Sequence, residues 1–193
     1  FGSDKLDWRE GQRLVGEALD LADASEQVIT EAEESIAATA ADHPEFDGKT
    51  ITMAYDYGPE YGTEYYTTTG GTAENIMTDL GFEPNPLAEE FVDDAVVSDE
   101  NQTKLDADIL MMVYADEEVR DTHESMPLFE QLEPVTEDRY VSLTFNEDEN
   151  VVSPDGTEMP NAVWAMRRGA SAESLPWAVD VIAEEWLADT DVS

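Results

Sequence analysis

The sequence predicts an α/β fold in which a central, mostly parallel sheet lies between two layers of helices. Residues 109–114 (ILMMVY) form a continuous apolar run, which is typical of a parallel strand covered on both faces. Residues 51–55 alternate with period 2 and are rich in β-branched side chains, which favours a second strand. Strand patterns alternate with helix patterns, without an internal repeat or linker, so we expect a three-layer, Rossmann-like unit.

Two helices are expected before the first strand. Asp7 and Glu10 have capping-box spacing, and Asp23 with Glu26 repeats it. The apolar residues assigned to one side of the first helix are Trp8, Leu14, Val15, Ala18 and Leu19. The second helix ends before Pro44. Together the two helices would span roughly 50 Å at 1.5 Å per residue, which suggests a strut.

The first strand is followed by a polar loop and a short helix. Thr72 is placed to cap this helix, and Gly81 stands where a left-handed C-cap residue is expected. In an open α/β sheet, ligands bind outside the carboxyl ends of the strands. We therefore expect the loop of residues 65–72 to face a ligand cleft.

Four residues of that loop are candidate ligand contacts: Tyr65, Tyr66, Thr69 and Gly70. The two tyrosines would point to opposite faces of an extended chain, so at most one of them lines the cleft.

The remaining elements follow from caps, turn residues and apolar spacing. Helical segments are expected at residues 98–104, 116–124, 127–132 and 162–168, and in a last helix that begins at Leu175-Pro176. A further strand is expected at residues 139–145, followed by an acidic loop with a turn at Asp155-Gly156.

The charge balance excludes some partners. The chain has 47 Asp and Glu against 9 Lys and Arg, with a formal net charge of −38. Nucleic-acid binding requires basic groups that neutralise phosphates, so nucleic acid is excluded, and an anionic membrane surface would repel the protein. Such a surface predicts adaptation to high salt, which screens self-repulsion. No apolar run approaches the length of a membrane span, so this chain is not expected to insert directly into a bilayer.

Motifs for catalysis or metal binding are absent from the sequence. There is no cysteine, no histidine pair at metal-ligand spacing, and no GxSxG, GxGxxG or Walker motif. We therefore predict no catalytic residue, no metal site and no cofactor. Basic residues carry more information because they are scarce. Arg167-Arg168 is the one basic doublet; with Trp164 it forms a candidate site for ligand oxygens and conjugated surfaces.

The order of these segments resembles the C-terminal half of a substrate-binding protein of an ABC importer, of the ferric-siderophore type. The stretches that carry the resemblance are DWREGQRLVGEALDLADASEQVITEAE, GKTITMAYDY with GGTAENIMTDLGF, AVVSDENQTKLDADILMMVYAD, PLFEQLEPVTEDRYVSLTF and SLPWAVDVIAEEWLA.

The resemblance implies that residues 1–22 are a long helix connecting two lobes and that residues 23–193 are the C-terminal lobe, with the N-terminal lobe absent from this chain. It further implies capture of a ferric siderophore outside the cytoplasm, by a periplasmic or cell-surface lipoprotein whose signal is not in this chain, and delivery to an ABC permease. Phe91 would contact the ligand, although some members have a tryptophan there. Glu100 would dock the permease.

Two alternatives stay open. The same fold could bind cobalamin, haem or another metal chelate. An α/β enzyme could use the strand-end carboxylates Asp56 and Asp116.

Overall fold

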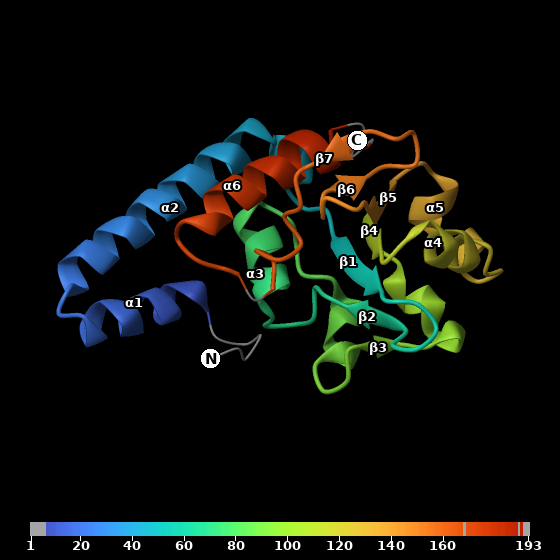
Figure 1. The fold of residues 1–193 in the computed structure, drawn as a ribbon, viewed down its shortest axis with the longest axis horizontal. Helices are drawn as coiled ribbons and strands as arrows, with labels where there is room; N and C mark the ends of the chain where they lie inside the picture. The colour runs from blue at the N-terminus through green and yellow to red at the C-terminus, as the bar shows by residue number, and fades with distance from the viewer. Residues whose placement is uncertain (1–6, 168, 189, 191–193) are drawn as a thin grey trace.

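A computed structural model of the chain describes residues 7–167, 169–188 and 190. It contains a seven-stranded sheet with the order β3-β2-β1-β4-β5-β6-β7, flanked by helices (Figure 1). The strands are β1 (Ile51–Asp56), β2 (Thr63–Tyr65), β3 (Val96–Val97), β4 (Ile109–Tyr114), β5 (Tyr140–Phe145), β6 (Val151–Val152) and β7 (Glu158–Met159).

The α-helices are α1 (Trp8–Ala18), α2 (Ala22–Asp42), α3 (Thr72–Asp79), α4 (Glu117–Glu124), α5 (Glu133–Thr136) and α6 (Ser174–Val181). The 3-10 helices are η1 (Pro44–Phe46), η2 (Pro86–Phe91), η3 (Asp99–Leu105) and η4 (Phe129–Gln131). A π-helical turn, η5 (Ile182–Trp186), continues α6.

The α/β class is confirmed, with a qualification on strand direction. The three central strands β1, β4 and β5 pair in parallel, as expected of strands buried on both faces. The outer pairs β1–β2, β2–β3, β5–β6 and β6–β7 are antiparallel. Strands β2, β6 and β7 lie in segments that the sequence patterns assign to loops.

Strand β4 divides the core into two layers. Ile109, Met111 and Val113 pack with the helices α2, α3 and α6 on one face of the sheet. Their neighbours Leu110 and Met112 pack on the other face, where α4 and α5 lie (Figure 1). All six residues of β4 are completely buried, so the three-layer arrangement predicted from this apolar run is present.

The two N-terminal helices fold back on each other. Asp7 caps α1 by accepting a hydrogen bond from the Arg9 amide at 2.9 Å, as predicted. The chain then reverses at Asp20, which has a positive φ of 58°. Helix α2 begins after Leu21 without a side-chain cap, so the predicted Asp23 cap is wrong. The segment is a helical hairpin rather than a straight strut (Figure 1).

Most of the apolar face predicted for α1 is exposed. Trp8 is buried at 5% exposure. Leu14 is 53% exposed and Leu19 is 63% exposed, because the tip of the hairpin projects beyond the sheet (Figure 1).

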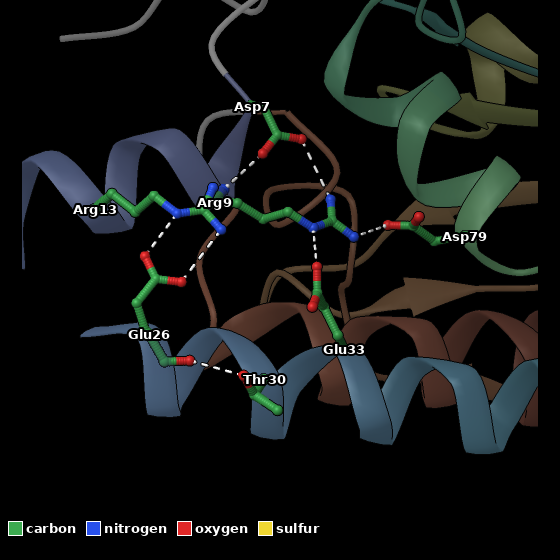
Figure 2. A network of polar contacts seen from close by, with 7 residues as sticks. All are labelled: Asp7, Arg9, Arg13, Glu26, Thr30, Glu33 and Asp79. Carbon is green, nitrogen blue, oxygen red and sulfur yellow. Dashed lines mark hydrogen bonds and ion pairs between the residues drawn. The ribbon is translucent and has the colours of Figure 1, made fainter. Parts of the chain in front are cut away.

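Arg9 joins α1 to two other helices. Its guanidinium binds Glu33 of α2 at 2.5 Å, Asp79 at the end of α3 at 2.8 Å, and Asp7 at 3.3 Å (Figure 2). Arg13 adds a second link from α1 to α2 through Glu26 at 2.7 Å (Figure 2). Charged contacts therefore replace apolar packing along much of α1.

Three local predictions have mixed outcomes. Gly71, rather than Thr72, is the N-cap residue of α3, and Thr72 is its first helical residue. Gly81 has the predicted left-handed conformation, with φ of 107°. The described part of the segment 162–168 forms consecutive turns instead of a helix.

Candidate functional site

A cleft of about 810 Å³ opens at the carboxyl ends of β1 and β5. This is the edge of a parallel sheet where ligands of α/β proteins bind. The residues that line it are Tyr55, Tyr57, Tyr61, Glu64, Tyr66, Asp93, Asp94, Ala95, Val96, Phe145, Asn161, Val163, Trp164 and Arg167. Six of these fourteen residues are aromatic.

The turn that joins β1 to β2 presents Tyr57 and Tyr61. Gly58 and Gly62 have φ of 88° and 71°, which L side chains rarely adopt. The Gly62 amide donates to the Gly58 carbonyl at 2.7 Å, and the Tyr57 amide donates to the Gly62 carbonyl at 3.0 Å. The glycines thus allow a tight turn that holds both tyrosines in the lining of the cleft.

Aromatic rings form the floor of the cleft. Tyr55 stacks on Tyr57 with 4.0 Å between ring centroids and lies 5.7 Å from Phe145. The hydroxyls of Tyr57 and Tyr66 are hydrogen-bonded at 2.5 Å. Burial raises the pKa of Tyr55 to about 12 and raises that of Tyr66 well above its usual range. The phenols therefore stay protonated at neutral pH and can donate hydrogen bonds.

Arg167 closes one side of this tyrosine array. Its guanidinium pairs with Glu64 through both terminal nitrogens, one of them 2.7 Å from the carboxylate. It donates to the Tyr57 hydroxyl at 3.1 Å and lies 4.9 Å from the centre of the Tyr66 ring. Burial alone would lower the pKa of Arg167, but the bonds to Glu64 and Tyr66 outweigh it and raise the pKa. Arg167 is thus a fixed cation, largely neutralised by Glu64.

Trp164 extends over the cleft wall and is 63% exposed. A Cβ atom added to Gly169 would lie 2.4 Å from Cδ1 of the Trp164 indole. The glycine therefore makes room for the ring in its present position.

Of the predicted contacts, Tyr66, Trp164 and Arg167 meet in this cleft. Tyr65 and Phe91 are buried and stack on each other at 4.5 Å, beside a smaller adjoining cavity of about 190 Å³.

The other predicted contacts lie elsewhere. Thr69 and Gly70 are exposed and line neither cavity. The Gly70 amide donates to Glu74 at 2.5 Å. Arg168 lies outside the described residues. Glu100 is exposed on η3, outside the cleft lining.

Several lining residues were not predicted, notably Tyr55, Tyr57, Glu64 and Phe145. A usable signal was present, because Tyr55 and Phe145 stand at the ends of two predicted strands. The same rule that selected the loop 65–72 applies to those strand ends.

The strand-end carboxylates considered for catalysis have structural roles. Asp56 is buried and binds the His123 ring at 2.5 Å and the Gly58 amide at 2.8 Å. Asp116 caps α4 by accepting from the Val119 amide at 2.9 Å. Neither carboxylate lines the cleft. Within the described residues, no cluster of His, Cys, Asp and Glu is arranged to hold a metal ion, and no helix there has both the length and the apolarity to span a membrane.

Solved structures share this fold. A periplasmic solute-binding protein from Mycobacterium smegmatis is 21% identical, with a TM-score of 0.68 over 95% of this chain and 56% of that one. Staphylococcus aureus SirA complexed with staphyloferrin B is 17% identical, with a TM-score of 0.71 over 98% of this chain and 63% of that one. Streptococcus pneumoniae PiaA in complex with ferrichrome is 16% identical, with a TM-score of 0.69 over 93% of this chain and 57% of that one.

The chain spans less than two thirds of the length of each of these proteins and corresponds to their C-terminal part. No curated protein sequence matches it. The sequence profile of the periplasmic binding proteins matches residues 1–144, three quarters of the chain. This chain therefore belongs to the periplasmic binding protein family.

Proposed function

We propose that this chain is the C-terminal lobe, with its connecting helix, of the solute-binding component of an ABC importer that captures a ferric siderophore. Residues 1–22 would be the connecting segment, with α1 (Trp8–Ala18) as its helix, and residues 23–193 would be the lobe. The protein would act outside the cytoplasm, as a periplasmic or cell-surface lipoprotein, and deliver the chelate to the permease. The observation that carries the proposal is the aromatic cleft with Arg167 at the carboxyl edge of the sheet.

The chemistry of the cleft suits a chelate with polar oxygens and flat or apolar faces. Tyr57 and Tyr66 supply phenol groups, and the exposed ring of Trp164 supplies a surface for packing. Relatives with this fold were solved with staphyloferrin B and with ferrichrome, which supports an iron chelate as the ligand. Arg168, Phe91 and Tyr65 complete the proposed contacts, with Thr69 and Gly70 on the neighbouring loop.

Binding is tested with the protein as its gene encodes it, titrated with ferric siderophores, haem and cobalamin. We expect a ferric siderophore to bind and Trp164→Ala to weaken that binding at least tenfold (about 1.4 kcal/mol). Trp177→Ala is the matched control, because Trp177 is 46% exposed on α6 and does not line the cleft. Selective binding of haem or cobalamin would keep the binding role and replace the ligand class. Absence of binding by every compound would refute the proposal.

Delivery to the permease is proposed to use Glu100, which is exposed on η3. Glu100→Ala should reduce uptake of the chelate by cells while leaving its affinity unchanged. Glu118→Ala, an exposed carboxylate on α4, is the control. Reduced affinity with normal uptake would contradict the docking role.

A further inference from the structure

The charges that line the cleft bear on which class of chelate it accepts. Three carboxylates, Glu64, Asp93 and Asp94, line it together with one guanidinium, that of Arg167, among the described residues. Asp93 and Asp94 are exposed at the wall. The described lining therefore carries more negative than positive charge.

Arg167 does not reverse this balance. Its two terminal nitrogens donate to the two carboxylate oxygens of Glu64, in the bidentate geometry that arginine forms with carboxylates. A ligand anion would have to compete with that carboxylate, or place its own charge next to it. Moreover, the whole chain carries a formal charge of −38, so the electrostatic field of the protein as a whole has the same sign as the net charge of the described cleft lining.

From this arrangement we infer that the cleft selects uncharged or cationic ferric chelates over polyanionic ones. The inference rests on the proposed function. A ferric trihydroxamate is uncharged, because three singly charged hydroxamates neutralise Fe³⁺, whereas a ferric tricatecholate is a trianion. The phenol hydroxyls and aromatic rings can contact either chelate, so net charge is what separates the two classes.

The test compares a tripodal ferric trihydroxamate with a tripodal ferric tricatecholate of similar size, at one salt concentration at which every variant is folded. For the wild-type protein, we expect the uncharged chelate to bind at least about tenfold more tightly, because the trianion meets a described lining with three carboxylates and one guanidinium. Glu64→Gln removes the carboxylate that pairs with Arg167. We expect this variant to reduce the ratio of the affinities for the uncharged and the trianionic chelate at least about threefold. Glu60→Gln is the control, since Glu60 is exposed on the adjoining turn and does not line the cleft.

The outcomes separate this inference from the proposed function. If neither these two chelates nor any other ferric siderophore binds, the proposed function fails. If a ferric siderophore binds and the trianion binds as tightly as the uncharged chelate, the proposed function stands and charge selection is overturned. An equal effect of Glu64→Gln and Glu60→Gln would overturn the assignment to the cleft carboxylates.

Discussion

The buried pair of Asp56 and His123 should contribute strongly to stability. Asp56 is 6% exposed and His123 is 1% exposed, and their side chains lie 2.5 Å apart. Removing the His123 ring leaves the buried Asp56 carboxylate without its hydrogen-bond partner, and removing the partner of a buried charge costs roughly 3–5 kcal/mol. For a chain of this size each kcal/mol lowers the Tm by about 2–4 °C, so we expect His123→Leu to lower the Tm by roughly 6–20 °C.

The pH dependence of the same variant tests the cause. Burial alone would raise the pKa of Asp56, but the hydrogen bonds from His123 and from the Gly58 amide lower it below its usual range. A depressed pKa contributes stability above the pKa of the unfolded chain, and that contribution is lost as the pH falls. Without His123, burial should raise the pKa of Asp56. Protonation of this carboxyl should then stabilise the folded variant as the pH falls.

The assay is urea unfolding of the wild type and His123→Leu from neutral to acid pH. His43→Leu is the matched control, because His43 pairs with the surface carboxylates Glu45 and Glu184. This substitution should lower the free energy of unfolding by about 1 kcal/mol or less. The destabilisation by His123→Leu should shrink as the pH falls. A loss below 1 kcal/mol, or a loss that does not change with pH, would refute the role assigned to the pair.

Three further predictions concern other parts of the chain. Arg9→Met should lower the free energy of unfolding by about 1–2 kcal/mol, and Arg13→Met, which breaks one exposed contact, should lower it by less. Chemical denaturation that ranks the two variants in the opposite order would contradict the network in Figure 2. Gly169→Ala should displace the Trp164 ring, changing its fluorescence and weakening chelate binding; an unchanged spectrum and affinity would show that the ring is not constrained there. The Tm should rise with salt over the molar range because the net charge is −38, and a Tm indifferent to salt would contradict adaptation to high salt.

The sequence predicted those helices and strands that can be identified from the pattern of their own residues. Strand β4 is apolar at every position and is buried at every position. Strands β2, β6 and β7 have only two or three residues each, so their formation depends on partners distant in sequence. The exposure of Leu14 and Leu19 was also unpredictable from periodicity, because the same stripe suits a buried helix or a projecting one.

The candidate site likewise contains residues that the sequence predicted and residues that it did not. Scarcity of basic residues singled out Arg167, and the structure brings it together with Tyr66 and Trp164. Its hydrogen bond to Glu64 joins residues separated by 103 positions, so no local sequence pattern could predict it. Tyr55 and Phe145 come close together because β1 and β5 both pair with β4, and this pairing joins segments that are distant in the sequence.

The most direct test is the position of the iron. A crystal of the full protein grown with a ferric trihydroxamate would show it by anomalous scattering. We predict one iron peak in the cleft bounded by Tyr55, Tyr66 and Trp164, with the chelate in contact with these rings. An iron peak on another surface, with the cleft empty, would contradict the proposed binding site.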